Sequence, residues 1–565
     1  MNNINNLTFK SQNYDDNKDN NVQNNSDNVF SDDLSDNLQN NINTDTSQNL
    51  QEINSTNNEN INDNENKENS KSNVTKVKKS NFQTKNRMKN SDNIQKNSAN
   101  MQNTKNSENT QNTKNSENTQ NTKNSENMQN RKSSDNIQNT KSSDNIVNFT
   151  KMRTKSVLEL IEIAKRMKID LSSVHERDIL SSIISKNLLN GDKVCVEGVL
   201  EVTDKYAFIR FSENDYVASS DDIYMPMQLV KKFNMRIGDV VEAEIKDSTA
   251  REKSYTVCHV SKLNAKTPQI MQPRESFEKL TALNPNRKIN LELHNKTAEN
   301  TSLRILDCIV PIGFGQRALI VAPPRSGKTV LMQQIAHGIT HNHKNAYLMA
   351  LLIDERPEEV TDMQRSIKGE VLSSNFDEPP SRHVHVVEMA LNKAKRLAES
   401  GIDVIIIMDS LTRLARAYNT VIPSSGKVLT GGLDANAMQK PKRFFGAARN
   451  LENSGSLTII ATALIDSGSR MDEVIFEEFK GTGNAEIVLD RKAAERRMFP
   501  ALDISKSGTR KEELLRQGNQ LSHLWLLRKV LTSMSTVEGL EFLIDKIRAT
   551  RDNEHFISVM NDAGR

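Results

Sequence analysis

The residues of this chain best suited to chemistry form the run Ala322–Thr329, which reads APPRSGKT. A short loop of this kind between an apolar strand and a helix lets backbone N–H groups cradle a triphosphate. Lys328 would reach the β- and γ-phosphates, and the Thr329 hydroxyl would reach a Mg²⁺ ion. The usual first glycine of such a loop is replaced by Ala322. Although a Gly-Lys-Thr loop can arise by chance, the run predicts a site for ATP and Mg²⁺.

Two apolar runs end in acidic residues, which suits the metal and water chemistry of ATP hydrolysis. Val404–Met408 is followed by Asp409, and Leu351–Ile353 is followed by Asp354 and Glu355. The first acid would hold the Mg²⁺ shell, and an acid of the second pair would orient or deprotonate the attacking water. Spacing alone does not separate Asp354 from Glu355. Each of these acids could instead cap the helix that follows it.

These residues need alternating strands and helices to hold them in place. Ala318–Val321 precedes the loop as an apolar strand, and Val330–Ala336 continues it with a helical pattern. Strands covered on both faces read as near-continuous apolar runs, and the further runs of this type are Ala346–Ile353, Asp403–Met408, Leu457–Leu464 and Glu486–Leu489. This order, which starts near residue 290, predicts an α/β nucleotide-binding domain.

Short strands punctuated by glycines precede that domain. The candidates are Lys193–Glu201, Tyr206–Phe211, Asp222–Met225, Val240–Lys246 and Ser254–Lys262. Five short strands in about seventy residues predict a small barrel of the oligonucleotide-binding (OB) type. Tyr206 and Phe208 lie two apart on one strand and therefore face the same way. They either stack on nucleic-acid bases, at ~1–3 kcal/mol per base, or form an inward core stripe.

The rest of the N-terminal half consists of two segments with helical periodicity and a polar tail. Val157–Met167 and Ile179–Leu188 predict a small helical module. In residues 1–150, 45 residues are Asn, and a nine-residue repeat without apolar positions begins at Gln102. Because too few apolar side chains exist there to offset chain entropy, we expect a disordered low-complexity tail.

Net charge, cysteine spacing and the length of the apolar runs indicate where the protein resides. Residues 1–66 hold 12 acids and 2 bases, net −10, and residues 67–150 hold 15 bases and 7 acids, net +8, within a total of +3. Cys195, Cys258 and Cys308 have no metal-ligand spacing, which suits reduced thiols in a cytosol. The apolar runs are too short to span a membrane. We therefore expect a cytoplasmic protein with no membrane partner.

Several longer segments together resemble one known family. They read LLIDERPEEVTDMQRSIKG at Leu351–Gly369, DSLTRLARAYN at Asp409–Asn419, SGKVLTGGLDANAMQKPKRFFGAARN at Ser425–Asn450, KGTGN at Lys480–Asn484 and SGTRKEELL at Ser507–Leu515. Over about residues 155–565 the chain resembles the bacterial transcription termination factor Rho family, whose members are RNA-dependent ATPases that work as hexameric rings. The resemblance implies an RNA-binding barrel followed by a RecA-like P-loop ATPase domain.

The resemblance implies roles for individual residues of the ATP site. Lys328, Glu355, Asp409 and Arg510 form the implied catalytic set, with Glu355 activating water and Asp409 linked to Mg²⁺ through Thr329 and water. Arg510 is similar to an arginine finger from a neighbouring subunit, where its guanidinium can bind γ-phosphate charge bidentately; alone, it would more often be a surface salt bridge. The implied nucleotide-binding residues are Gly313, Phe314, Gly315, Gln316, Arg317, Ala318, Arg325, Ser326, Gly327, Lys328, Thr329, Val330, Arg356 and the adenine-packing Phe499.

The resemblance also implies two RNA sites. The primary site, on the barrel, comprises Lys205, Tyr206, Ala207, Phe208, Ile209, Arg210, Asp222, Ile223, Tyr224, Lys253, Ser254 and Tyr255. The secondary site, in loops that line the ring channel, comprises Lys427, Val428, Leu429, Thr430, Gly431, Gly432 and Arg470. Members of the family often have lysine where Arg470 stands, and arginine keeps the charge but changes the hydrogen-bond geometry.

Together these features predict a multidomain chain. Its parts are a disordered tail at 1–150, a helical module at 151–190, a five-stranded OB-type β-barrel at 191–265, a connector at 266–290 and a RecA-like α/β P-loop ATPase domain at 291–565. The expected function is an ATP-dependent 5′–3′ RNA translocase or helicase that terminates transcription. We expect it to act as a homohexamer on nascent single-stranded RNA, with RNA polymerase as a further partner.

Two other functions fit part of the pattern. A rotary ATP synthase-type catalytic subunit shares the plan of the ATPase domain, but it gives no reason for the aromatic residues of the barrel or for the Lys427 loop. A non-enzymatic RNA-binding protein would not need Lys328, Glu355 and Asp409 together.

The opposite charges within the tail generate a first prediction. Residues 1–66 can pair transiently with the basic residues 67–150, so deleting 1–66 should raise weak, salt-sensitive RNA affinity. Deleting 1–150 should remove that gain while RNA-stimulated ATPase activity persists. RNA affinity measured across a salt series for the full chain and both truncations tests this. Equal salt slopes in all three would mean that the tail does not touch RNA.

Overall fold

A computed structural model describes residues 145–171, 173, 175–247, 254–268, 274–516 and 518–563. The expected tail up to residue 144, with its repeat and its two charge blocks, lies outside the described residues. Two elements then precede the first expected helix. They are β1 (Ile146–Asn148) and α1 (Phe149–Arg153), so the boundary expected at 150/151 falls inside α1. The pattern missed β1 because three residues carry no periodicity; β1 forms by parallel pairing with Lys193–Cys195.

The five expected strands form the predicted closed barrel. They are β2 (Lys193–Val202), β3 (Ala207–Arg210), β4 (Ile223–Met225), β5 (Val240–Lys246) and β6 (Thr256–Leu263). The strand order is β2-β3-β4-β6-β5, and β5 pairs again with β2 to close the barrel. Among these five strands, the β4–β6 pairing is parallel and the other pairings are antiparallel. The links include η1 (Ser212–Asn214) and α4 (Met227–Lys232).

The helical module shares one hydrophobic core with the barrel. It contains α2 (Val157–Arg166) and α3 (Glu176–Leu189). Ser156 and Glu159 form a reciprocal capping box at the start of α2, which satisfies two free backbone donors. Buried residues of both helices pack with the inward residues of the strands.

The C-terminal domain is built on a mostly parallel sheet. Its strand order is β12-β11-β13-β17-β10-β18-β19, with β16 and β7 paired antiparallel beside β17. The strands are β7 (Ala282–Leu283), β10 (Arg317–Ala322), β11 (Tyr347–Glu355), β12 (Glu370–Asn375), β13 (Asp403–Asp409), β16 (Arg449–Leu451), β17 (Ser456–Leu464), β18 (Ala485–Val488) and β19 (Gly508–Thr509). Smaller elements are η3 (Phe277–Lys279), β8 (Lys288–Ile289), β9 (Ile312–Gly313), β14 (Val428–Leu429), η4 (Thr430–Gly432), β15 (Leu433–Asp434) and η5 (Glu512–Leu514).

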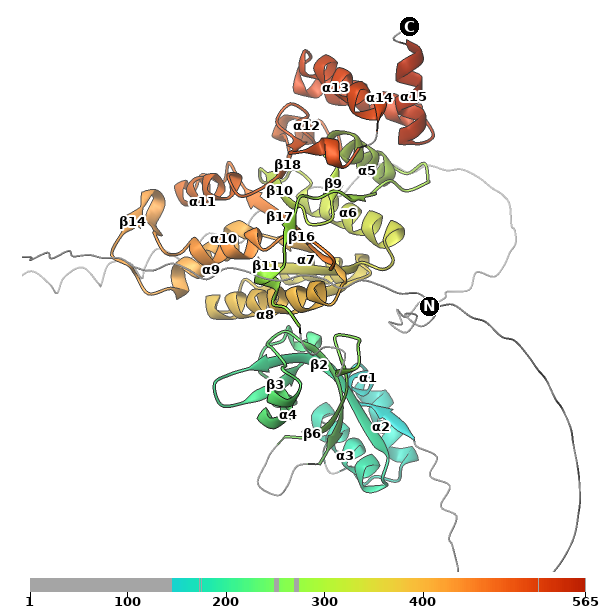
Figure 1. The fold of residues 1–565 in the computed structure, drawn as a ribbon, viewed down its shortest axis with the longest axis vertical. Coiled ribbons are helices and arrows are strands. Elements are labelled where there is room, and N and C mark those ends of the chain that lie inside the picture. Colours follow the sequence, from blue (N-terminus) through green and yellow to red (C-terminus); the bar gives the residue numbers. More distant parts are fainter. Residues whose placement is uncertain are drawn as a thin grey trace, which may run out of the picture. The chain divides into compact units, whose positions relative to one another are not determined.

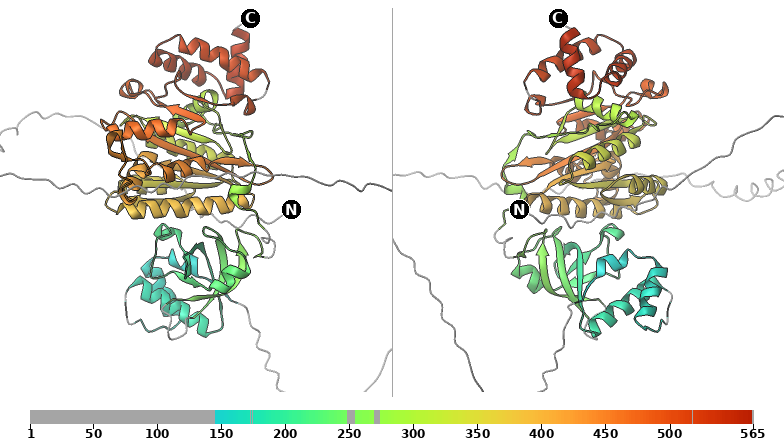
Figure 2. Two further views of the ribbon diagram at one scale, coloured as in Figure 1. Left: turned by 60° about the vertical axis from the view of Figure 1, so that its left-hand side comes forward. Right: turned by 90° about the vertical axis from the view of Figure 1, so that its right-hand side faces the viewer.

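Helices cover both faces of this sheet, as Figures 1 and 2 show. Ala318, Ile320 and Ala322 of β10 belong to one core, whereas Leu319 and Val321 belong to the other. The first core packs against α5 (Ala298–Ile309), α6 (Lys328–Asn342) and α7 (Pro357–Ser366). The second packs against α8 (Pro380–Glu399), α9 (Leu411–Val421), α10 (Gln439–Gly446) and α11 (Arg470–Lys480). Burial on both faces explains the near-continuous apolar runs.

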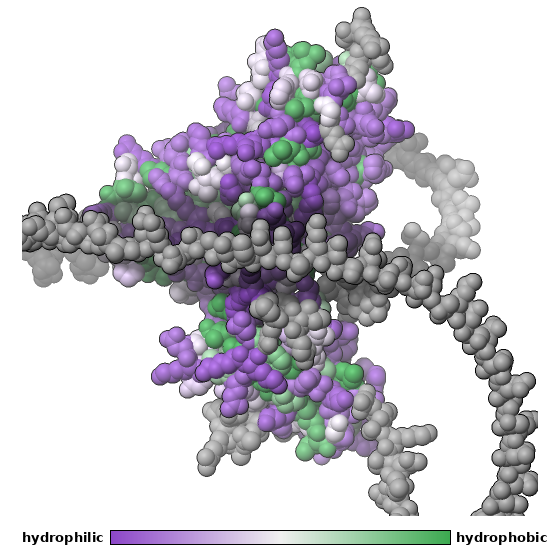
Figure 3. All heavy atoms as spheres, in the orientation of Figure 1, coloured by the Kyte–Doolittle hydropathy of each residue, from purple (hydrophilic) through white to green (hydrophobic). Residues whose placement is uncertain are grey.

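Three helices complete the chain after the short α12 (Arg491–Glu495). They are α13 (Asn519–Thr532), α14 (Thr536–Arg548) and α15 (Asn553–Ala563). The face of the molecule seen in Figure 3 is mostly hydrophilic, with small scattered apolar patches. Among the described residues, no helix has the length and apolar character that a membrane span requires.

Candidate functional site

The predicted phosphate loop connects the end of β10 to the start of α6. Arg325 and Gly327 adopt positive φ values of 63° and 84°, which turn the chain sharply. No side chain caps the N-terminus of α6, so its first N–H groups are available to an anion. The Ser326 hydroxyl is buried and lacks a hydrogen-bond partner among the described residues. This local geometry suits a phosphate.

Lys328 lies between the two acids that the strand ends predicted. Its Nζ is 2.6 Å from Asp409 Oδ2 and 3.4 Å from Glu355 Oε1. Thr462 donates a 2.7 Å hydrogen bond to Asp409 Oδ1. The strands that carry the acids are neighbours, with Leu352 opposite Asp409, so the two acids meet at the carboxyl edge of the sheet. The structure therefore brings Lys328, Glu355 and Asp409 into one cluster.

Burial and charge perturb the pKa values in this cluster. Burial raises the pKa of Glu355, and the Asp409 carboxylate raises it further, against the opposing effect of Lys328. For Lys328, burial lowers the pKa, but the Asp409 and Glu355 carboxylates outweigh it and raise the pKa. Glu355 is thus a stronger base than an exposed glutamate, as a group that accepts a proton from water requires.

Two residues of this site were missed by sequence reasoning. Arg413 on α9 places Nη2 3.5 Å from Glu355 Oε1, and Glu359 on α7 accepts a 3.4 Å hydrogen bond from Thr329. Arg413 lies one helical turn after Asp409, which is the signal that could have identified it. Glu359 lies four residues after Glu355, but that spacing is common on helices and carries no signal.

The residues present fit a Mg²⁺ ion bound together with phosphates. Mg²⁺ in nucleotide sites takes one or two protein oxygens and fills its shell with phosphates and water. The Thr329 hydroxyl and the Asp409 carboxylate are oxygen donors of this type. Among the described residues, no group of three or more His, Cys, Asp or Glu could hold a metal ion.

Phe499 lies against the phosphate loop, whereas Arg356 is exposed at the start of the helix after β11. A Cβ added to Gly327 would lie 3.0 Å from the Phe499 ring, so the ring stands against the loop. Its side chain is 43% exposed, which leaves a ring surface for an adenine to stack on. Arg356 is exposed at the N-cap of α7, directly after Glu355.

The turn Gly313–Arg317 lies at the opposite end of β10 from the phosphate loop. The six residues of β10 separate the two by roughly 20 Å at ~3.3 Å per residue. The turn is held by Asn484, which accepts a 2.8 Å hydrogen bond from Gln316 Nε2 and, through its carbonyl, a 2.9 Å bond from the Arg510 N–H. Within one chain the turn and the loop therefore cannot contact the same phosphate.

Arg510 belongs to the same distant end. It follows β19 and is exposed, and its side chain makes no hydrogen bond or ion pair within the described part of the chain. Burial, then Arg449 and Arg510, lower the pKa of the nearby Arg317. Arg510 and the turn thus form a second basic edge that cannot reach the Lys328 of its own chain.

Three aromatic residues expected at the RNA site, Tyr206, Phe208 and Tyr224, face outward from the barrel. Ala207, Ile209 and Ile223 are fully buried, whereas Tyr206 is 56% exposed and Phe208 is partly exposed. Phe208 is paired across the strands with Tyr224, and their rings meet edge to face at 5.9 Å. The inward core stripe is therefore not formed by Tyr206 and Phe208. An outward pair of this kind can stack on bases.

A buried polar group borders these rings. Arg210 is ion-paired with Asp222 and with Glu201, the latter at 2.6 Å. Asp222 Oδ1 is buried and has no partner among the described residues. Burial raises the pKa of Asp222 against the opposing bonds from Ser219 and Arg210. The free oxygen could accept a hydrogen bond from the amino group of a base.

The remaining residues of the expected primary RNA site differ in how accessible their side chains are. Tyr255 contacts the Phe149 ring edge to face at 6.1 Å, and its hydroxyl lies 3.1 Å from Ser181 Oγ. It fixes α3 to the barrel, so its ring is less available to a base than expected. Lys205 is exposed and Ser254 is partly exposed. Lys253 lies outside the described residues.

The two loops expected at the secondary site lie together. The segment Lys427–Gly432 holds β14 and η4, which form a mostly exposed hairpin with the buried β15 that follows. A Cβ added to Gly431 would meet Met471 N at 2.8 Å and the Arg470 carbonyl carbon at 3.0 Å, so the hairpin tip packs on the start of α11. Lys427, Val428, Leu429, Thr430 and Arg470 are exposed.

Helix α9 connects this hairpin region to the catalytic cluster. It begins two residues after Asp409 and carries Arg413 beside Glu355. One turn later, Arg416 forms a bidentate pair with Asp472 on α11, with contacts of 2.6–2.9 Å. The N-terminal half of α9 therefore contacts both the base candidate, through Arg413, and the start of α11, through Arg416.

Comparison with known proteins adds two family matches. The ATP synthase alpha/beta family, nucleotide-binding domain, matches residues 302–509. The RNA-binding domain of Rho termination factor matches residues 196–269. The first match covers the catalytic cluster, and the second covers the outward aromatic face.

Relatives are similar over almost their whole length. Transcription termination factor Rho of Cereibacter sphaeroides is 52% identical over 417 residues, 74% of this chain and 99% of that protein. The Rho protein of Escherichia coli K12 is 50% identical over 416 residues, 73% of this chain and 99% of its own. A solved ATPase of a type III secretion system is 22% identical to this chain, with a TM-score of 0.42. The likeness covers 50% of this chain and 86% of that chain.

The barrel face and the hairpin should be separable by mutation. Phe208→Ala and Tyr224→Ala should each weaken binding of single-stranded RNA by about ten-fold, because each loses a stacking platform. Lys427→Ala should leave that binding nearly intact and lower the RNA stimulation of ATPase activity. Fluorescence anisotropy with labelled poly(C) and an ATPase assay measure the two effects.

Phe542→Ala removes another partly exposed aromatic side chain, 37% exposed on α14, and should leave RNA binding unchanged. Loss of the barrel's thermal transition in Phe208→Ala would instead show that Phe208 is part of the core.

Proposed function

The chain belongs to the transcription termination factor Rho family, and we propose that it hydrolyses ATP to translocate 5′ to 3′ along nascent single-stranded RNA and end transcription. It combines an RNA-binding domain with a nucleotide-binding ATPase domain. The observation that carries the proposal is that the Lys328–Asp409–Glu355 cluster and the outward Phe208–Tyr224 pair occur in one chain.

The two alternative functions each leave a feature without a purpose. An ATP synthase-type subunit accounts for the match over residues 302–509 but not for an RNA-binding domain at residues 196–269. A non-enzymatic RNA-binding protein accounts for the barrel but not for a half-buried Lys328 between two acids. An RNA-dependent ATPase needs both features.

In the proposed reaction, Lys328 and the N–H groups of the phosphate loop bind the β- and γ-phosphates. Thr329 and Asp409 would hold Mg²⁺, which would supply neutralising charge to the phosphates when bound. Glu355 accepts the proton of the attacking water, and Arg413 keeps its carboxylate in place at 3.5 Å. Phe499 offers its exposed ring to the adenine.

We further propose that the working form is a ring, a homohexamer. The phosphate loop follows the C-terminal end of β10, whereas the exposed Arg510 lies near the N-terminal end of that strand. This separation supports the proposal. A neighbouring chain can supply Arg510 to the site that its own chain cannot reach. The buried turn Gly313–Arg317 would then support Arg510 through Asn484 rather than contact the nucleotide of its own chain.

The proposed path of the RNA runs from the barrel to the hairpin. Bases stack on Phe208 and Tyr224, and the strand then meets Lys427 and Arg470 in the ring channel. Movement follows ATP turnover because α9 contacts both Glu355 and, through Asp472, the start of α11. We place the protein in the cytoplasm with RNA polymerase as a further partner.

The catalytic assignment is tested with two variants. Lys328→Ala should abolish RNA-stimulated ATP turnover by removing the phosphate contact. Glu355→Gln should still bind ATP but lose about 10²–10⁴-fold in turnover, because general-base assistance contributes that much. Nucleotide affinity and poly(C)-stimulated phosphate release provide the two measurements. The control is Glu358→Gln, an exposed acid three residues away, and near-normal turnover in Glu355→Gln would exclude Glu355 as the base.

The shared site is tested by mixing subunits. Arg510→Ala rings and Lys328→Ala rings should each be inactive, because an arginine finger contributes ~10³–10⁵ in rate. Mixed rings should regain part of the activity, since some interfaces then contain both an intact Lys328 and an intact Arg510. A titration of one variant into the other, followed by ATPase assay, measures the rescue. The absence of rescue at every ratio would contradict a role for Arg510 in the neighbouring site and leave it a structural role.

A further inference from the structure

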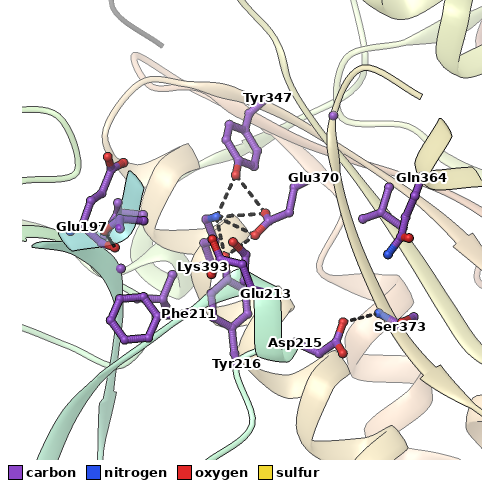
Figure 4. A pocket seen from close by; sticks show the side chains of 17 residues that line it. Glu197, Phe211, Glu213, Asp215, Tyr216, Tyr347, Gln364, Glu370, Ser373 and Lys393 are labelled. Carbon is purple, nitrogen blue, oxygen red and sulfur yellow. Dashed lines mark hydrogen bonds and ion pairs between the residues drawn. The ribbon is translucent and has the colours of Figure 1, made fainter. Parts of the chain in front are cut away.

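A buried polar cluster joins the barrel to the ATPase domain. We define this interdomain cluster as Tyr216, which follows η1 in the barrel, with Glu370 at the start of β12 and Lys393 on α8. The Tyr216 hydroxyl donates to Glu370 Oε1 and accepts from Lys393 Nζ at 2.8 Å. Lys393 also bonds both Glu370 oxygens at 2.9–3.0 Å. Figure 4 shows these side chains pointing toward one another.

The cluster has no unsatisfied hydroxyl or ammonium group. Tyr347, at the start of β11, repeats the pattern on the ATPase side: its hydroxyl donates to Glu370 Oε2 at 2.8 Å and accepts from Lys393 at 2.7 Å. Burial, and then Glu370, raise the pKa of Tyr216 well above its usual value, so the phenol stays protonated and donates. Within the described cluster, the contacts of the Tyr216 hydroxyl are those that cross between the domains.

The backbone that presents Tyr216 is strained. Asp215 and Tyr216 have φ values of 51° and 60°, a left-handed conformation that is rare for a bulky side chain. Asp215 is held from the ATPase side, where it accepts from Ser373 N–H at 2.7 Å and Arg382 Nη2 at 3.1 Å. Strained residues persist where surrounding contacts over-determine them, and they concentrate at functional positions.

Contacts connect this cluster to the RNA face. Arg210, which lies behind the Phe208 ring at 5.2 Å, is bonded to Glu201. The other Glu201 oxygen is 3.8 Å from His385 Nε2 on α8, and the same nitrogen is 3.2 Å from the Tyr216 carbonyl oxygen. RNA that binds Arg210 would compete with Glu201 for the Arg210 guanidinium. The Glu201 carboxylate would then change its contact with His385, whose ring also contacts the Tyr216 carbonyl oxygen.

On the other side, the cluster reaches the strand that carries Glu355. Glu370 begins β12, which pairs in parallel with β11 from Met349 to Glu355. At the far end of this pairing, Phe376 N–H bonds the Glu355 carbonyl at 3.2 Å. A displacement of Glu370 along the strand direction would therefore act on the backbone of Glu355.

The interface beside the cluster is not closely packed. A cavity of about 510 Å³ lies there, lined by residues of both domains that include Glu197, Glu213, Tyr216, Glu370 and Lys393 (Figure 4). Close-packed apolar interiors resist rearrangement, whereas a polar contact next to a cavity can change partners without creating a new void. The cluster is thus placed where the two domains can shift.

We propose that Tyr216, Glu370 and Lys393 are positioning residues that transmit RNA binding on the barrel to the ATPase site. Occupancy of the Phe208–Tyr224 face changes the Arg210–Glu201–His385 contacts, and the Tyr216–Glu370–Lys393 contacts pass that change to β12 and β11. The inference rests on the proposed RNA-dependent ATPase function and adds the route by which the barrel takes part in it.

The test uses the full chain and removes single hydroxyls. Tyr216→Phe should bind a fluorescent oligocytidylate and ATP within about two-fold of wild type, yet lose about five-fold or more in poly(C)-stimulated turnover, a factor within the usual range of coupling. The RNA-free rate should stay unchanged. A purely structural role would instead lower RNA binding, the RNA-free rate and thermal stability together.

Tyr347→Phe is the matched control. It removes a hydroxyl with the same two partners, but within the ATPase domain, and should keep RNA stimulation. Glu370→Gln repeats the Tyr216→Phe test with a second member of the cluster and should show the same selective loss. Full stimulation in Tyr216→Phe, or equal losses in Tyr216→Phe and Tyr347→Phe, would overturn the inference. A wild-type protein without RNA-stimulated turnover would instead overturn the proposed function itself.

Discussion

The contact of Lys328 with Asp409 and Glu355 is the constraint on which the rest of the ATPase domain depends. A buried lysine costs several kcal/mol to desolvate unless opposite charge lies beside it. The two acids supply that charge only if β10, β11 and β13 end at the same edge of the sheet. Parallel pairing through β17 achieves this, with Leu352 opposite Asp409 and Ile407 opposite Ile460. This alignment requires strands that are buried on both faces. Their sequences are therefore continuously apolar, and helices cover both faces of the sheet.

Sequence patterns predicted the parts whose signals are local. Val404–Met408 is fully buried, so its run is continuous, and the acid after it must emerge at the strand end. Around Phe208, the alternation of Ala207 and Ile209 inward with Phe208 outward follows from the two-residue period of a strand. Lys328 was identifiable because a phosphate loop depends on consecutive residues. In these cases the partners that define the geometry lie within a few residues.

The features that sequence reasoning missed depend on distant partners. Tyr255 is committed to Ser181, 74 residues earlier in the chain, and no local pattern reveals that contact. The turn at Gly313–Arg317 lies at the opposite edge of the sheet from the phosphate loop because β10 separates the two, a placement that the residues of the turn do not show. Tyr216 drew no prediction from the sequence because its partners, Glu370 and Lys393, belong to another domain. The short β1 likewise needs β2 to exist as a strand.

The chemistry of the contacts differs between rigid and movable parts of the molecule. Within the barrel and on each face of the sheet, apolar side chains fill the interior, and separating them would open cavities at a high cost in free energy. Between functional parts the contacts are ionic or hydrogen-bonded: Lys328 with its acids, Arg416 with Asp472, and Tyr216 with Glu370 and Lys393. Such groups can exchange one partner of opposite charge for another, including phosphate, while remaining satisfied. A protein that must couple nucleotide state to RNA contacts requires this division, because packed apolar cores move as units and only their polar junctions can rearrange.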